Sequence, residues 1–154
     1  MTRKNHKTSS RKGKAFRLKV PAVSENLDII RKFIGGIAEN AGFSEDDIYQ
    51  IELAVDEAAA NVIKHAYTNE HTDEKLIHIT VQQKPDKLEI TIADKGVGFD
   101  PDSVPTPDIE EYLKKLKPGG LGLHLIRTLM DEVSFSIRPG VRNAVRMVKY
   151  LSRQ

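Results

Sequence analysis

Three separated segments of the chain carry residue types that together suit a nucleotide site. The first, Glu57-Ala58-Ala59-Ala60-Asn61, places an acid and an amide four residues apart, on the same side of a predicted helix. A carboxylate within reach of a nucleophile can act as a general base, and a neutral amide oxygen suits Mg²⁺. The alternative is an ordinary Glu and Asn on an exposed helix face, although Asn is disfavoured inside an Ala-rich helix.

The second segment, Asp94-Lys95-Gly96-Val97-Gly98-Phe99, follows an apolar run that is typical of a strand. Gly96 and Gly98 permit positive φ and a close approach of the backbone to a ligand. A carboxylate at Asp94 can accept a hydrogen bond from the exocyclic amine of adenine, whereas guanine presents a carbonyl oxygen there. The alternative is a simple turn that closes the strand, because Asp and Gly favour turns.

The third segment, Gly119-Gly120-Leu121-Gly122-Leu123, is predicted to be a glycine-rich loop that leads into an apolar helix. Backbone N–H groups at a helix N-terminus attract phosphate. No Gly-Lys-Ser/Thr follows, so this is not a P-loop, and the pattern is not that of a dinucleotide fingerprint. A tight loop without function is the alternative, but the position after a proline-rich stretch favours the hinge of a lid. All three segments, in this order, predict an ATP site.

Alternating and helical patterns place these segments on secondary structure. Residues 16–20 read as an edge strand that ends at Pro21. Ser24 is the predicted N-cap of a helix that stops near Gly42, and Ser44 is the predicted N-cap of the next helix, with Asp47 as its capping-box partner. The second helix has an apolar stripe that consists of Ile48, Ile51, Val55, Ala58, Val62 and Ala66.

The remainder of the chain predicts more strands and one further helix. Strands are expected at residues 76–83 and 87–93, around a turn at Pro85-Asp86, and a closing hairpin is expected at residues 133–137 and 144–150, around Pro139-Gly140. Residues 100–118 are predicted to be a mobile loop with a short helix near 109–116, and a helix is predicted over 121–130. This order indicates an α/β (α+β) two-layer sandwich, with three helices on one face of a mostly antiparallel mixed sheet.

Composition is consistent with one cytoplasmic domain. The chain has 154 residues and no cysteine, and no apolar run approaches membrane-spanning length. Residues 1–14 hold six Lys or Arg and no acid, which leaves 18 basic against 22 acidic side chains in the body. We interpret residues 1–14 as a basic disordered tail and residues 15–154 as the domain, although such a tail can also contact nucleic acid or acidic proteins. The body gives no indication of direct nucleic-acid binding.

The three segments resemble the N, G1 and G2 boxes of the GHKL ATPases, the superfamily of gyrase, MutL and sensor histidine kinases. The closer resemblance is to the RsbW-like serine/threonine kinases that act as anti-sigma factors. It is carried by residues 52–67, which are similar to the N box, and by residues 119–133, which are similar to the G2 box and its helix. The likeness extends over nearly all of residues 16–151 and implies a Bergerat-type ATP-binding fold.

The resemblance also implies roles for individual residues. Glu57 would activate a partner's serine or threonine hydroxyl, Asn61 would coordinate Mg²⁺, and Asp94 would bind the adenine amine. Gly96 and Gly98 would shape the adenine wall, and the segment from Gly119 to Leu123, with Gly120, Leu121 and Gly122, would hold the phosphates beneath a lid at about 100–118. The implied cofactors are ATP and Mg²⁺. The implied partners are a STAS-type anti-sigma-factor antagonist and a sigma factor, and the family's habit of dimerising allows a homodimer.

One departure from the family leaves alternatives open. The family often has Gly-Thr-Thr before its last strand, where this chain has Arg142-Asn143-Ala144, and this difference can alter nucleotide affinity. The main alternative is a sequestering module that binds a sigma factor or another regulator without transferring phosphate. A detached histidine-kinase catalytic domain is a weaker one, because only a short tail and one strand precede the first helix, which leaves no room for a dimerising hairpin.

Overall fold

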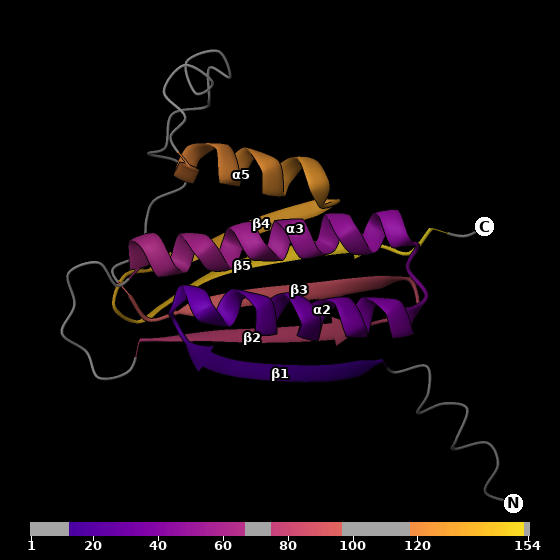
Figure 1. Ribbon diagram of the computed structural model, residues 1–154, viewed down its shortest axis with the longest axis horizontal. Coiled ribbons are helices and arrows are strands. Elements are labelled where there is room, and N and C mark those ends of the chain that lie inside the picture. Colours follow the sequence, from indigo (N-terminus) through magenta and orange to yellow (C-terminus); the bar gives the residue numbers. More distant parts are fainter. Residues whose placement is uncertain (1–12, 67–74, 97–117, 153–154) are drawn as a thin grey trace, which may run out of the picture.

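Five strands form one sheet in the order β1-β2-β3-β5-β4, and three helices lie over one of its faces (Figure 1). The computed structural model describes residues 13–66, 75–96 and 118–152. The strands are β1 (Lys14–Pro21), β2 (Leu76–Gln83), β3 (Lys87–Asp94), β4 (Glu132–Arg138) and β5 (Arg142–Tyr150). The helices are α2 (Leu27–Ala41), α3 (Glu45–Asn61) and α5 (Pro118–Leu129), with a 3₁₀ turn η1 (Ser24–Asn26) and a π-helical turn η2 (Val62–Ala66).

The predicted two-layer α/β architecture is confirmed. All four strand pairings among the described residues are antiparallel, so the sheet has no mixed part in this region. β1 lies at one edge, as Pro21 predicts, and β4 lies at the other. The predicted lid at 100–118 and its short helix near 109–116 fall almost wholly outside the described residues, as does most of the predicted tail.

The core lies between the sheet and the helix layer. Every second residue of the central strands faces the helices, and the period of two thereby separates an apolar face from a polar one. The helices contribute isoleucine and valine from their buried stripes, and α3 adds small alanines that permit close packing on the sheet. Fully buried side chains in this layer include Ile30, Ile34, Ile51, Val55, Ile77, Ile79, Val81, Leu88, Ile90, Ile92 and Met147.

Helix α2 begins later than the cap prediction indicated. Ser24 opens the 3₁₀ turn η1, the α-helix starts at Leu27, and no side chain caps it. The side-chain Nδ2 of Asn26 instead donates to the carbonyl oxygen of Pro21 at 2.8 Å, which connects the start of the helix to the end of β1. The prediction of a Ser24 cap is therefore wrong.

The end of α2 and the start of α3 follow the predicted chemistry. Gly42 adopts φ 96°, its N–H donates to Glu39, and the N–H of Phe43 donates to Ala38, the two bonds of a Schellman motif. Two residues later, Ser44 Oγ accepts from the Asp47 N–H at 3.1 Å and caps α3. The two helices are therefore joined by a short connection whose geometry is set at both ends.

Helix α5 extends further toward the N-terminus than predicted. It begins at Pro118, so Gly119, Gly120 and Gly122 belong to the first turns of the helix and not to a loop in front of it. Proline suits the first helical position because its missing N–H has no intrahelical partner there. The glycine-rich segment is thus a helix start in this structure.

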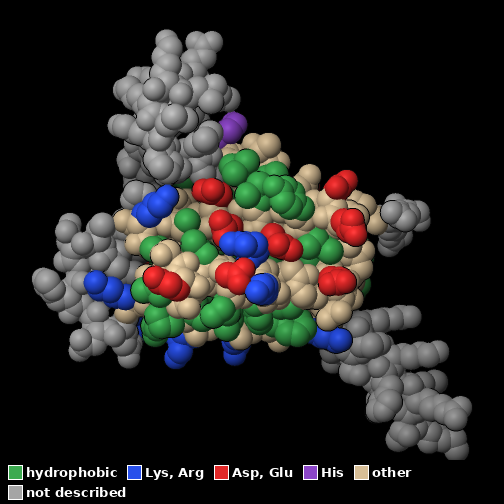
Figure 2. Space-filling model, in the orientation of Figure 1, with side chains coloured by type: hydrophobic (Ala, Val, Ile, Leu, Met, Phe, Trp, Pro, Cys, Tyr) green, Lys and Arg blue, Asp and Glu red, His purple; other side chains and the backbone are tan. Residues whose placement is uncertain are grey.

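The exposed face of the helix layer carries mixed charge (Figure 2). On α2, Asp28 pairs with Arg31 at 3.5 Å and with Lys32 at 2.9 Å, and Arg31 also reaches Asp56 on α3 at 3.2 Å. No helix in the described parts of the chain is long and apolar enough to cross a membrane.

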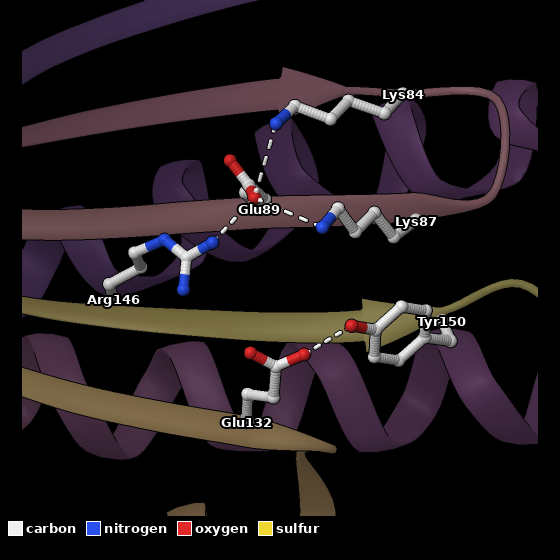
Figure 3. A network of polar contacts seen from close by, with 6 residues as sticks. All are labelled: Lys84, Lys87, Glu89, Glu132, Arg146 and Tyr150. Carbon is white, nitrogen blue, oxygen red and sulfur yellow. Dashed lines mark hydrogen bonds and ion pairs between the residues drawn. The ribbon is translucent and has the colours of Figure 1, made fainter.

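The uncovered face of the sheet is polar and holds a charge cluster around Glu89 on β3 (Figure 3). Arg146, Lys84 and Lys87 all approach Glu89 Oε1, the two lysines at 3.3 and 3.6 Å. Burial opposes ionisation of Glu89, but hydrogen bonds from Arg146 and Lys84 outweigh it and hold the pKa of this carboxyl below its ordinary value. Nearby, the Tyr150 hydroxyl donates to Glu132.

Gly36 inside α2 and Gly42 directly after it should respond in opposite ways to substitution by alanine. Gly42→Ala forces a side chain into the left-handed conformation, and we expect it to lower the free energy of unfolding by about 1 kcal/mol. Gly36→Ala is the matched control, because Gly36 lies inside the helix with open space around it, and it should raise stability by about 0.5–1 kcal/mol. Urea denaturation of both variants measures this, and equal effects would contradict the assigned Gly42 geometry.

Candidate nucleotide site

A pocket lies between α3, α5 and one end of the sheet. Asn61 and Asp94 line it together, although η2, β2 and most of β3 lie between them in the sequence. The remaining wall is mostly apolar, which suits the faces of a flat ring. It consists of Ala58, Val62, Ile92, Leu123, Ile126, Phe135, Ile137, Asn143, Ala144 and Val145.

Asp94 is buried, with 5% of its surface exposed, at the last position of β3. Its Oδ1 accepts from the Gly96 N–H at 2.8 Å and from Asn143 Nδ2 at 3.0 Å. The second contact exists because β3 and β5 pair in a register that sets Asp94 opposite Asn143. The carboxylate is therefore held in one orientation at the pocket wall, which is the geometry needed to recognise a donor on a base.

Gly96 is also buried, and both its N–H and its carbonyl oxygen make hydrogen bonds. Its N–H donates to Asp94, and its carbonyl accepts from Asn143 Nδ2 and from the Gly140 N–H, both at 2.8 Å. Positive φ among the described glycines occurs at Gly13, Gly42 and Gly140, and not at Gly96. Gly96 instead supplies hydrogen bonds at the end of β3, and the close approach of its backbone to a ligand stays a prediction.

Asn61 and Glu57 lie one helical turn apart on α3, as predicted, but in different surroundings. Asn61 is 6% exposed and lines the pocket, whereas Glu57 is half-buried and is not among the pocket-lining residues. α3 passes directly after Asn61 into the π-helical turn η2. Wide turns of this kind occur often at functional sites, and here one follows the amide that the sequence predicts to be a magnesium ligand.

Burial raises the pKa of Glu57 above its ordinary value, and the neighbouring negative charge of Asp56 adds to this, while Lys64 opposes it. A carboxyl whose pKa moves toward neutrality is a stronger base once it is ionised. Asp56 is kept in place by its ion pair with Arg31 on α2. The environment of Glu57 thus suits the role of general base.

The other predicted site residues are placed only in part. Leu123 is 5% exposed and lines the pocket. The first turns of α5 contain Gly119, Gly120, Leu121 and Gly122. The same helix then contributes Leu123 and Ile126 to the pocket wall. Gly98 lies outside the described residues.

The sequence did not single out the hairpin residues that close the pocket. Phe135 and Ile137 from β4, and Val145 from β5, form its apolar wall. Their alternation predicted strands, but alternation alone does not say that the inward face of a hairpin meets a ligand. Only the sheet order, in which β5 lies beside β3, brings this wall next to Asp94.

Comparison with known proteins agrees with this fold. A family model described as a histidine kinase-like ATPase domain matches residues 20–149. The chain is 38% identical over 141 residues to serine-protein kinase RsbW of Staphylococcus aureus, and 40% identical over 141 residues to that of Bacillus licheniformis. These matches cover 89% of this chain and 87% and 86% of the two relatives.

Two solved structures share the fold. A structure of the SiaB-SiaC complex from Pseudomonas aeruginosa matches with a TM-score of 0.65 and 11% identity, over 95% of both chains. A structure of the RsbU and RsbW domains of a Mycobacterium tuberculosis protein matches with a TM-score of 0.64 and 15% identity, over 92% of this chain and 33% of that one.

The chain therefore belongs to the histidine kinase-like ATPase domain family. Within that family its curated relatives are serine-protein kinases that align over most of their length, and protein serine kinase is the enzyme class of this chain.

Glu57 and Glu89 should give opposite pH dependences of stability. Because folding raises the pKa of Glu57, its contribution to stability is present in acid and is lost as the pH rises through the folded pKa. We therefore expect Glu57→Gln to raise the melting temperature at pH 8, with the gain disappearing near pH 4. A gain that grows toward acid would contradict this environment for Glu57.

Glu89→Gln is the matched control for this measurement. Folding lowers the pKa of Glu89, so its contribution is present above the unfolded pKa and is lost as the pH falls. Glu89→Gln should lower the melting temperature at pH 8, and the loss should shrink in acid. Thermal denaturation of both variants between pH 4 and 8 measures the two signs in one series.

Proposed function

We propose that this protein is an ATP-dependent serine/threonine kinase that acts as an anti-sigma factor. It would phosphorylate a STAS-type anti-sigma-factor antagonist and would also bind a sigma factor, two partners that act in the cytoplasm. The single observation that carries the nucleotide site is the buried carboxylate of Asp94, held by Gly96 and Asn143 at the wall of an apolar pocket. The match to RsbW kinases over most of the chain supports phosphoryl transfer to a protein.

In this proposal Asp94 accepts a hydrogen bond from the amine of adenine, and the apolar hairpin wall packs against the base. Gly98 would complete the adenine wall beside Gly96. The backbone N–H groups at the start of α5, around Gly119, Gly120 and Gly122, would bind the phosphates, since a helix N-terminus favours anions. Glu57 would take the proton from the partner's hydroxyl as it attacks. Transfer then depends mainly on position and on neutralising the phosphate charge.

The residues present fit a magnesium ion that arrives with the nucleotide. Asn61 places a neutral amide at the pocket, and no hydrogen bond to its side chain occurs among the described residues. No group of three or more His, Cys, Asp or Glu that could hold a metal occurs in the described part of the chain, which is consistent with an ion held by one amide and by phosphate oxygens. When bound, Mg²⁺ would neutralise phosphate charge, and Asn61 is the residue that would hold it.

A sequestering module without phosphoryl transfer is the competing function. The departure Arg142-Asn143-Ala144 is the observation that favours it, because Ala144 lines the pocket without any side-chain hydrogen bond. Against it stands Asn143, which takes part in fixing Asp94. Homodimer formation, the basic tail and the lid stay predictions.

The first test is binding. We expect titration calorimetry to show Mg²⁺-dependent binding of ATP in preference to GTP, and Asp94→Ala to weaken ATP binding by more than tenfold. Lys95→Ala, the exposed neighbour, is the matched control and should bind ATP as the wild type does. Absence of ATP binding by folded wild-type protein would leave the fold and remove the kinase assignment.

The second test is transfer to a protein substrate. Purified STAS-domain proteins from the same genome are incubated one by one with the kinase and radiolabelled ATP. Glu57→Gln should reduce labelling about 10²–10⁴-fold at unchanged ATP affinity, because it removes the base and keeps the shape. Glu52→Gln, on the same helix against Gly35 of α2, is the control. Sigma-factor binding without labelling of any STAS protein would favour the sequestering module.

A further inference from the structure

Asn143 is oriented by the hydrogen bonds that it donates. Its Nδ2 lies 3.0 Å from Asp94 Oδ1 and 2.8 Å from the carbonyl oxygen of Gly96, so both of its N–H groups point at acceptors. If the amide were turned over, its oxygen would face these two acceptors and would gain no donor. The network therefore settles which end of the amide is the oxygen.

The oxygen of this amide has no partner. Asn143 is 3% exposed, and its Oδ1 is the only fully buried side-chain nitrogen or oxygen atom among the described residues that lacks a hydrogen bond. A buried acceptor without a donor is unfavourable and is uncommon in native proteins. Asn143 also lines the pocket, beside Asp94. A ligand that brings a donor to this point would satisfy the orphaned oxygen.

Asp94 has a similar arrangement. Its Oδ1 receives both hydrogen bonds that the described residues make to this carboxylate, and its Oδ2 receives none from them. The wall thus carries two acceptors on neighbouring strands, at paired positions of β3 and β5. An amino group has two N–H donors, whereas a carbonyl oxygen in the same place would face two acceptors.

We propose that Asn143 is a specificity-determining residue of the nucleotide site, which fixes Asp94 through Nδ2 and offers Oδ1 as a second acceptor for the 6-amino group of a purine. This inference rests on the proposed ATP site and adds a selection rule to it. Both N–H groups of the amine are used, one by Asp94 and one by Asn143. A 6-oxo purine is rejected because its oxygen leaves both acceptors buried and unpaired.

The experiment compares nucleotides that differ at position 6. Calorimetry gives the dissociation constants of ATP and inosine triphosphate, which has a 6-oxo group and lacks the 2-amino group of guanine. Asn143→Val should reduce the preference for ATP over inosine triphosphate at least tenfold. Ile137→Val is the matched control, since it trims the apolar wall of the same pocket and should weaken both nucleotides equally.

A second measurement needs no variant and therefore does not depend on Asn143→Val folding. ATP with one N6 hydrogen replaced by methyl keeps a single donor, so the wild type should bind it at least tenfold more weakly than ATP. Equal wild-type affinity for the two nucleotides would overturn the role of Asn143.

The outcomes separate the two proposals. Tight ATP binding with an unchanged preference in Asn143→Val would overturn the role of Asn143 and leave the ATP site intact. Failure of the folded wild type to bind any of these nucleotides would overturn the ATP site itself. Loss of preference in Ile137→Val as large as that in Asn143→Val would show that general packing, and not the second acceptor, sets the selection.

Discussion

The pairing of β3 with β5 is the constraint on which the pocket depends. It joins Asp94 to Asn143 across 49 residues of chain and turns two strand ends into one hydrogen-bonded wall. The strands themselves are held by the core, where Ile90 and Ile92 of β3 and Met147 of β5 are fully buried against the helices. A slip of one residue in this pairing would point the apolar face of β5 away from the helices and would also separate Asn143 from Asp94. Fold stability and the proposed recognition of the base therefore depend on the same register.

The helix layer contributes the polar residues that the sheet does not. α3 packs through alanines and aliphatic side chains, and the same helix carries Asn61 into the pocket and holds Glu57 beside it. Glu57 on α3 and Glu89 on β3 show how two environments shift the pKa of a carboxyl in opposite directions. Three cations surround Glu89 on the open face and favour its charge, whereas Glu57 lies partly buried next to another acid. The protein is expected to give up stability at Glu57 in return for a stronger base.

Much of this architecture could be predicted because the determining signals are local. Strand alternation, Gly42 after α2 and Ser44 before α3 each act over a few residues, and the structure confirms them. Ser24 failed as a cap because Asn26 makes a contact to β1 that depends on tertiary structure. The glycines from 119 to 122 were assigned to a loop on propensity, yet they begin α5. The apolar pocket wall of Phe135 and Ile137 could not be predicted, because it depends on the order of the strands in the sheet and no single segment of the sequence determines that order.

Gly96 also connects the pocket to an exposed turn that does not line it. Its carbonyl accepts the N–H of Gly140, which lies in the turn between β4 and β5. Gly140 has φ 77°, a conformation that glycine adopts with ease and other residues do not. A residue other than glycine would be strained in this conformation, although open space surrounds the position, and a shift of the turn that relieves the strain would pass through this hydrogen bond to the backbone that orients Asp94. A substitution in the turn between β4 and β5 is thus expected to change the affinity for the nucleotide, although every residue that lines the pocket stays the same.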